Sequence, residues 1–434
     1  MDKMADVLGR AGAWCGQNKY LSGIKNAFQN FMPLTIAGAI GVLWCNVLVN
    51  ESTGLGIFFK PIMALEFLNP AFQAVNFCTI SCITVGITLG IAQEIGVWNM
   101  GAEKAGYIPG LVGLAAWLSV TNTSHMVEGA KEAFTGIAGN ELGATGLFTG
   151  MIIGVLSVEL FCFFEKQDAL KIKMPEQVPP GVARAFEVLV PATITLIITA
   201  CIGSACYNLT GLYLNDVIKN GIQGPLGAVG ATIPGVMIIY LVIMLFWLVG
   251  IHGNNMLSAV KEALFTPLAL ENVEKFNKGE KPTNIINMYA LQMWGEFGGS
   301  GVTIGLVIAI MIFGKREDNK AIATLSLVPG LFNINETVTF GIPMVLNPIL
   351  GIPFVVAPLI TIIIGYVLTV IGFCPVACLT VPWTTPPIVF GFLATGANVM
   401  GAVTQAILIV VSTVIYVPFL IAYEKYQNKQ AAEA

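Results

Sequence analysis

The chain has 434 residues, of which 56% are hydrophobic and only 11% are charged. A soluble protein carries about 25% charged residues, so this composition excludes an ordinary soluble fold. It also excludes a disordered chain, which is poor in apolar residues. The net charge of −4 leaves no basic face for nucleic acid, and we expect no nucleic-acid partner. We therefore expect an all-α polytopic membrane protein surrounded by lipid.

Six continuous apolar segments occupy the first part of the chain, most of them near the length of about 20 residues that a spanning helix needs. They are 29–49, 73–94, 106–121, 142–164, 186–206 and 228–250. Residues 1–28 precede them. We interpret these residues as a cytoplasmic lead-in that lies on the membrane, with a surface helix as the alternative.

The second part of the chain is less regular. Residues 283–314 are apolar but are interrupted by Glu296 and by a Gly-Gly-Ser-Gly sequence at 298–301. One long apolar region follows at 321–423, and residues 424–434 form a predicted cytoplasmic tail.

Lysine and arginine residues indicate sidedness, because cytoplasmic loops of membrane proteins carry an excess of them. With six spans that start inside and an even number of later crossings, 18 of the 21 basic residues are cytoplasmic. The exceptions are Lys60, Lys131 and Lys219. The same count assigns the charged segment 261–281 to the cytoplasm. We therefore expect both termini in the cytoplasm.

Glu336 is the one charged residue within 321–423. A carboxylate at membrane depth is costly and normally faces a cavity or a partner; a position at the water interface is the alternative. The same region is rich in prolines, which interrupt helices; they include those at positions 329, 343, 348, 353, 358, 375, 382, 386 and 387. Because broken backbone in a membrane must be buried in protein or line a cavity, we expect discontinuous helices around a polar site. Asn333 and Asn335 would supply hydrogen bonds to a hydroxyl-rich ligand.

His252 lies in a second polar cluster, Gly-Ile-His-Gly-Asn-Asn at 250–255. It is either a histidine at the membrane boundary or a hydrogen-bonding, proton-handling ligand of the same cavity. A lone histidine does not make a metal site, and the nine cysteines include no Cys-x-x-Cys pair. We therefore expect no metal and no cofactor. Most cysteines lie in apolar runs, which favours small buried side chains over a disulfide or redox role.

Trp383 lies in a third cluster, Val-Pro-Trp-Thr-Thr-Pro-Pro at 381–387. It either anchors the chain at the membrane interface or offers an aromatic platform to a sugar face. Glu296 either lines the cavity or belongs to a surface loop. The glycines at 298–301 lack the Lys-Ser/Thr of a phosphate-binding loop, so we expect close packing at a hairpin tip.

These clusters, in this order, resemble the membrane subunit (enzyme IIC) of bacterial phosphotransferase sugar systems, in the lactose/cellobiose/N,N′-diacetylchitobiose family. The resemblance covers nearly the whole chain. Its most specific motifs are His-Gly-Asn at 252–254, Gly-Gly-Ser-Gly at 298–301, Pro-Gly-Leu-Phe-Asn-Ile-Asn-Glu at 329–336 and the cluster at 381–387. The sequence departs from the family at 25–28, where it has Lys-Asn-Ala-Phe and many members have Arg-Asp-Gly-Phe. Lysine keeps the positive charge but lacks the forked geometry of arginine, so no family role is assigned to this position.

The resemblance implies about ten transmembrane helices and two re-entrant hairpins, in a homodimer in the bacterial cell membrane. It implies a scaffold and dimerisation domain at 29–227 and a sugar-binding transport domain at 228–423, which moves as an elevator. A phosphocysteine on the partner subunit, enzyme IIB, would then phosphorylate the sugar, with enzyme IIA supplying IIB. This chain would not be catalytic without IIB.

The family motifs also imply roles for single residues. Glu336 would bind sugar hydroxyls and take a proton as general base, and His252 would orient the same hydroxyl. The further substrate-binding candidates are Trp383, Trp247, Asn333, Asn335, Asn254 and Glu296.

The predicted function is therefore import of a β-linked disaccharide and its presentation to IIB. A cellobiose-type sugar is the first choice, with diacetylchitobiose or lactose next. The alternative is a proton-coupled secondary sugar transporter, in which Glu336 is a proton site. That transporter would need a pH gradient and would deliver free sugar.

Overall fold

The computed structural model describes residues 10–433 except 11–12, 15–16, 52–55, 57–58, 126–133, 176, 226–229, 343 and 346. Within these residues the regular secondary structure is helical apart from one short hairpin, and the chain divides into two compact units. Unit 1 comprises Met1–Gly16, Ala39–Ala74 and Val229–Ala434; unit 2 comprises Gln17–Gly38 and Val75–Ala228. Helices α2 (Lys19–Leu43) and α4 (Asn69–Cys78) each contribute residues to both units.

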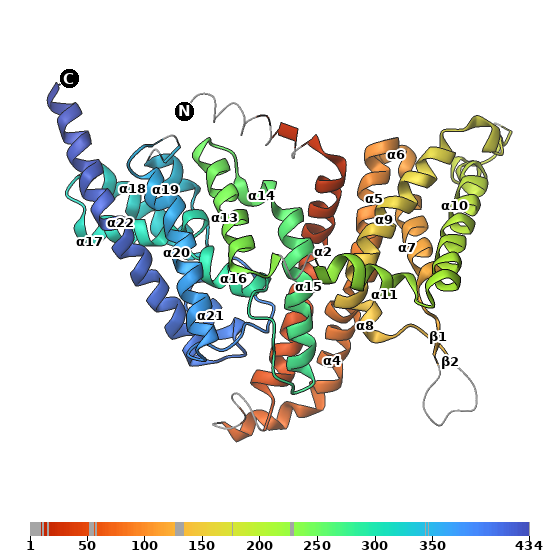
Figure 1. The fold of residues 1–434 in the computed structure, drawn as a ribbon, viewed down its shortest axis with the longest axis horizontal. Coiled ribbons are helices and arrows are strands. Elements are labelled where there is room, and N and C mark those ends of the chain that lie inside the picture. Colours follow the sequence, from red (N-terminus) through yellow and green to blue (C-terminus); the bar gives the residue numbers. More distant parts are fainter. Residues whose placement is uncertain are drawn as a thin grey trace. The chain divides into compact units, whose positions relative to one another are not determined.

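Unit 2 is built around four apolar helices that pack on one another (Figure 1). They are α5 (Ile83–Met100), α7 (Ile108–Val120), α9 (Ala144–Glu165) and α10 (Pro180–Thr210). Small residues bring their backbones together, as in other membrane helix pairs. A Cβ at Gly113 of α7 would lie 2.3 Å from Ala92 of α5, and one at Gly150 of α9 would lie 2.2 Å from Thr88 of α5.

Shorter elements connect these helices. They are η3 (Ile80–Cys82), α6 (Ala102–Ala105), β1 (Ser124–His125), β2 (Phe134–Thr135), α8 (Gly139–Leu142), η4 (Asp168–Leu170), α11 (Leu214–Ile218) and η5 (Lys219–Gln223). The two strands are antiparallel, with Ser124 opposite Thr135 and His125 opposite Phe134.

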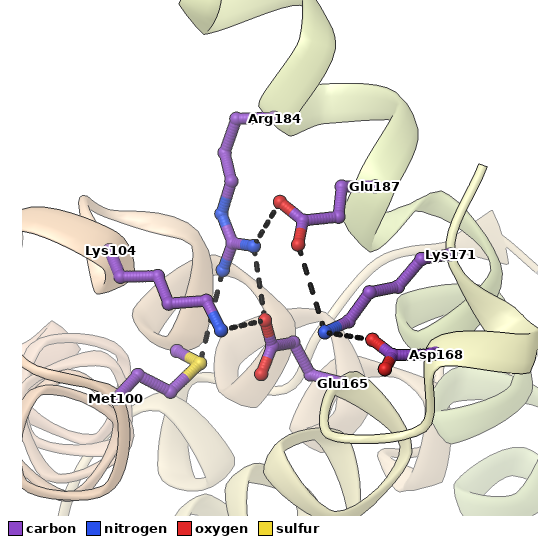
Figure 2. Close-up of polar contacts among 7 residues, drawn as sticks. All are labelled: Met100, Lys104, Glu165, Asp168, Lys171, Arg184 and Glu187. Atoms are coloured by element: carbon purple, nitrogen blue, oxygen red, sulfur yellow. Dashed lines mark hydrogen bonds and ion pairs between the residues drawn. The ribbon is translucent and has the colours of Figure 1, made fainter. Parts of the chain in front are cut away.

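A network of ion pairs joins the segments of unit 2 where α9 ends (Figure 2). Its cations are Lys104, Lys171 and Arg184, and its anions are Glu165, Asp168 and Glu187. The central side chain, Glu165, is only 1% exposed and receives Lys104 at 2.9 Å and Arg184 at 3.1 Å. The network therefore fixes α6 and the start of α10 against the end of α9.

Unit 1 contains the remaining elements. They are η1 (Trp44–Leu48), η2 (Lys60–Leu68), α13 (Ile233–Leu248), α14 (Gly253–Met256), α15 (Ser258–Asn277), α16 (Met288–Gly295), η6 (Ser300–Val302), α17 (Ile304–Phe313), α18 (Glu317–Leu331), α19 (Glu336–Gly341), α20 (Gly351–Val370), α21 (Val389–Ala394) and α22 (Val399–Glu433). Helix α22 packs along α17, α20 and α21 (Figure 1).

The early segment Ala39–Ala74 belongs to unit 1 through specific contacts. The Trp44 ring stacks on Phe72 with the ring centres 4.2 Å apart, and its Nε1 donates to Asn69 Oδ1 at 3.1 Å. Asn46 Nδ2 donates to Asn277 Oδ1, at the end of α15, at 3.1 Å. The Asn46 contact joins parts of the chain that are 231 residues apart in sequence.

The six predicted apolar segments all coincide with helices, although the helices in 106–121 and 228–250 are shorter than a typical span. Among the described residues six helices are long and apolar enough to span a membrane, or seven if one bent pair counts as a span. That pair consists of Met288–Val302 and Ile304–Phe313, bent by 60°, and it confirms the predicted interruption of 283–314. Helices α7 and α13 are apolar but shorter.

Several details differ from the sequence prediction. Helix α2 starts at Lys19, within the predicted lead-in 1–28, because the apolar pattern continues across residue 28; residues 1–9, 11–12 and 15–16 of that lead-in lie outside the described residues. The predicted tail 424–434 continues α22 to Glu433, and the Glu424 carboxylate, 6% exposed, accepts the backbone N–H of Lys315 at 2.9 Å.

The prolines and cysteines also differ from the prediction. Pro329 and Pro358 lie inside α18 and α20, so these two do not interrupt their helices. The eight cysteines that the structure describes are all unpaired, with Cys15 outside the described residues. Only three of them are buried, namely Cys162, Cys374 and Cys378.

Candidate functional site

Glu336 and His252 face each other in unit 1. His252 Nε2 lies 3.9 Å from Glu336 Oε1, and their side chains are 39% and 48% exposed. Glu336 is the first residue of α19, and His252 directly precedes α14. A carboxylate in the first turn of a helix is stabilised by the helix dipole. The structure therefore brings the two predicted catalytic residues together at an accessible position.

Local backbone features fix the histidine. Gly250 has φ +80°, which lets the chain turn after α13. A Cβ at Gly253 would lie 2.0 Å from the Ile243 carbonyl oxygen, so only glycine permits this approach to α13. His252 Nδ1 accepts the backbone N–H of Asn255 at 3.3 Å. That bond assigns the ring proton to Nε2, on the side of Glu336.

The two predicted sugar-stacking tryptophans have different environments. Trp247 is 2% exposed and packs against the His252 ring, with ring centres 4.4 Å apart, and edge-on against Phe354. It supports the histidine from within the protein, and its Nε1 has no partner among the described residues. Trp383 is 46% exposed, so its ring surface is open to a ligand.

The glycine sequence at 298–301 forms a tightly packed turn between α16 and α17. Gly298, Gly299 and Gly301 all have positive φ. A Cβ would meet Asn335 at 2.6 Å from Gly299 and Phe354 at 2.4 Å from Gly301. The N–H groups of Gly298 and Gly299 already bind protein oxygens. Close packing therefore accounts for this sequence, as expected, and the amides are not arranged to hold a phosphate.

The predicted asparagine ligands hold the backbone around this turn. Asn335, 4% exposed, donates to the Ser300 carbonyl oxygen at 2.7 Å. Asn254 donates to Ser300 Oγ at 2.9 Å. The Asn333 side chain binds Gly298 and the segment that contains Trp383. The three amides therefore link the segments that carry His252, Glu336 and Trp383.

Glu296 forms a buried cluster beside the turn. Its Oε1 pairs with Lys261 Nζ and accepts the Tyr240 hydroxyl proton at 2.7 Å. The Lys261 and Glu296 side chains are 7% and 18% exposed. Lys261 also donates to Asn254 Oδ1 at 3.4 Å, which connects the cluster to the site.

A family model described as "Phosphotransferase system, EIIC" matches residues 25–358. The chain belongs to this family. The matched residues of this EIIC chain include His252, the glycine turn and Glu336, whereas Trp383 lies beyond them.

Individual relatives extend the match to the rest of the EIIC chain. It is 33% identical to the oligo-β-mannoside-specific EIIC component of Bacillus subtilis (strain 168), over 98% of this chain and 94% of that protein. It is 30% identical to the cellobiose-specific EIIC component of Lactococcus lactis subsp. lactis (strain IL1403), over 98% of each. It is also similar to the crystal structure of the transporter ChbC, the IIC component from the N,N′-diacetylchitobiose-specific phosphotransferase system. The TM-score is 0.88 at 29% identity, over 97% of each chain. The EIIC chain is therefore an α-helical multi-span membrane protein.

Lys261 is the residue of this EIIC site that sequence reasoning missed. The sequence count treated it only as one charge of a cytoplasmic segment, whereas the structure buries its side chain beside Glu296. The available signal was that most of its neighbours are apolar, namely Ala259, Val260, Ala263 and Leu264, with Glu262 as the exception. Among the described residues no group of three His, Cys, Asp or Glu side chains is placed to hold a metal ion.

Proposed function

We propose that this EIIC chain is the sugar permease subunit of a phosphoenolpyruvate-dependent phosphotransferase system that imports a β-linked disaccharide. A cellobiose-type sugar is the first choice, with diacetylchitobiose or lactose next. The observation that carries the proposal is the accessible pair of Glu336 and His252, whose facing atoms are 3.9 Å apart. The relatives named for cellobiose, oligo-β-mannoside and diacetylchitobiose support a β-linked sugar.

The spacing of the pair suits one sugar hydroxyl. A hydroxyl oxygen at about 2.8 Å from each group fits between atoms that are 3.9 Å apart. It would accept the Nε2 proton of His252 and donate its own proton to Glu336. Trp383 would pack its exposed ring on the apolar face of the sugar, and Trp247 would hold the histidine ring in place.

The pair would also serve the phosphoryl transfer. The sugar oxygen attacks the phosphorus of the IIB phosphocysteine, so that a P–O bond forms and the S–P bond breaks. Glu336 takes the hydroxyl proton, and the cysteine leaves as a thiolate. IIA then supplies the next phosphoryl group to IIB. In this scheme the chain positions the sugar and the proton acceptor, and it has no activity without IIB.

Transport would follow from the architecture that the family suggests. We propose about ten spans with two re-entrant hairpins, a homodimer formed through 29–227, and elevator movement of 228–423. Both termini would be cytoplasmic. The bent pair of α16 and α17 supports a re-entrant hairpin, and the compactness of unit 2 supports a separate scaffold. The site-bearing unit also includes Ala39–Ala74.

Binding and transfer assays test the proposal. Purified protein in detergent, without IIB, is titrated with cellobiose, lactose and diacetylchitobiose, and phosphorylated IIB is then added. We expect one β-disaccharide to bind in preference and sugar phosphate to form only with IIB. Uptake of free sugar driven by a pH gradient alone would refute the proposal in favour of proton coupling.

A matched pair of tryptophan variants tests whether the sugar binds next to Trp383. Trp383→Ala should weaken disaccharide binding, because it removes the exposed ring that we propose packs on the sugar. Trp98→Ala removes a ring that is 55% exposed on α5 of unit 2 and should leave binding unchanged. Equal effects of the two variants would argue against a role for Trp383 in the site.

A further inference from the structure

Asn333 ends helix α18 in a conformation that few residues adopt. Its φ is +63°, in the left-handed region. The N–H of Ile334 binds the Pro329 carbonyl at 3.0 Å, and the N–H of Asn333 binds the Gly330 carbonyl at 3.0 Å. This pair of bonds is the Schellman motif, in which glycine or asparagine takes the left-handed position. The motif reverses the chain just before Glu336 and so determines where that carboxylate lies.

The Asn333 side chain is committed to two other segments. Its Oδ1 accepts the backbone N–H of Gly298, in the turn between α16 and α17, at 2.6 Å. Its Nδ2 donates to the carbonyl oxygens of Trp383 and Thr385, at 2.5 and 3.0 Å. A side-chain amide has two N–H donors, and protein carbonyls occupy both of them.

We propose that Asn333 is a positioning residue that fixes the Trp383 segment and the glycine turn relative to Glu336, rather than a ligand of the sugar. This inference rests on the proposed function and assigns Asn333 a role within it. Its backbone conformation positions Glu336, and its side chain binds the carbonyl oxygen of Trp383, whose ring would contact the sugar. One residue therefore sets the distance between the proton acceptor and the aromatic platform.

Two substitutions separate the parts of this role. Asn333→Gly keeps the left-handed backbone, which glycine adopts freely, and removes all three side-chain bonds. Asn333→Asp keeps an acceptor for Gly298 but places a carboxylate against two carbonyl oxygens. Glu336→Gln is the contrast, because that side chain faces His252 and should not hold either segment.

Hydrogen exchange in the sugar-free protein is the first test. We expect Asn333→Gly to speed amide exchange about tenfold at 296–302 and 383–385, Asn333→Asp to do so mainly at 383–385, and Glu336→Gln to change neither. Unchanged exchange in both Asn333 variants would overturn the proposal. This test involves no sugar, so its result holds even if no β-disaccharide binds and the proposed function fails.

Binding of deoxy sugars is the second test. A positioning residue weakens binding by the same factor for the parent disaccharide and for each of its monodeoxy analogues. A direct ligand behaves differently, because its loss disappears for the analogue that lacks the contacted hydroxyl. We therefore expect one constant factor for Asn333→Gly, with Glu336→Gln showing the hydroxyl-specific pattern. A hydroxyl-specific pattern for Asn333→Gly would make it a sugar ligand and overturn the proposal.

Discussion

Replacing Glu336 by glutamine separates sugar binding from phosphoryl transfer. The substitution keeps the size of the side chain and removes its charge. Hydrogen bonds to charged groups contribute about 1.5–3 kcal/mol and neutral ones about 0.5–1.5 kcal/mol, so binding should lose about 1–1.5 kcal/mol, or about 5- to 13-fold. Because the carboxylate is 48% exposed, the lower end of this range applies. Transfer should fall further, since a general base contributes about 10²–10⁴-fold.

Two assays on the purified protein measure these effects. Equilibrium binding without IIB gives the first factor, and formation of sugar phosphate with phosphorylated IIB at saturating sugar gives the second. Glu317→Gln is the matched control, because Glu317 lies at the start of α18, away from Glu336, with its side chain 86% exposed. Equal losses in both assays would refute a role for Glu336 as base, and no loss in either would refute the site.

Three further predictions concern the surroundings of the site and the charged surface. Lys261→Met should have a lower midpoint of thermal unfolding than the double variant Lys261→Met/Glu296→Gln. The single variant leaves the Glu296 carboxylate buried and unpaired, which costs about 3–5 kcal/mol. A double variant that is less stable than the single one would contradict this. Gly301→Ala should lower both the unfolding midpoint and sugar binding, since its φ is +77° and the new Cβ would lie 2.4 Å from a Phe354 ring atom; wild-type values of both would show that the turn adapts. A hydrogen bond from Arg316 holds the pKa of Asp318 below its usual range. The pair therefore stabilises the protein fully at pH values above the ordinary aspartate pKa of about 3.9. This stabilisation is lost as the pH falls through the lowered pKa. Asp318→Asn should therefore be slightly less stable at neutral pH and match the parent in acid, and a difference that persists in acid would contradict the assignment.

The chemistry of the site was visible in the sequence, because rare residue types mark it. Glu336 is the one charged residue within 321–423, and His252 is one of two histidines, so their isolation indicated a polar site. The spans were equally visible, since long continuous apolar segments in a chain with 11% charged residues are typical of membrane helices.

The partners of each residue were not visible, because they lie far away in sequence. Asn333 bonds residues 35 and 50 positions away, and Glu296 pairs with a lysine 35 positions away. A motif shows that an amide or a carboxylate is present but not whether it faces a ligand or the protein backbone. The contacts of Asn46 with α15, which associate Ala39–Ala74 with the C-terminal residues, have no local signal either.

The ion-pair network at the end of α9 has a consequence for membrane insertion. Lys104, Lys171 and Arg184 contribute to the charge bias that predicts the orientation of the chain, yet in the folded protein each of them is paired with a carboxylate. The pairs of Glu165 with Lys104 and Arg184 join α6, α9 and α10, so these two pairs form only after the helices have packed. In the proposed orientation, Lys104 and Arg184 would lack Glu165 as a partner during synthesis and would help to retain their loops in the cytoplasm, where carboxylates have little influence. We propose that these two charges first direct insertion of the chain and later hold its packed helices together, so Glu165→Gln should weaken the second role while leaving the first intact.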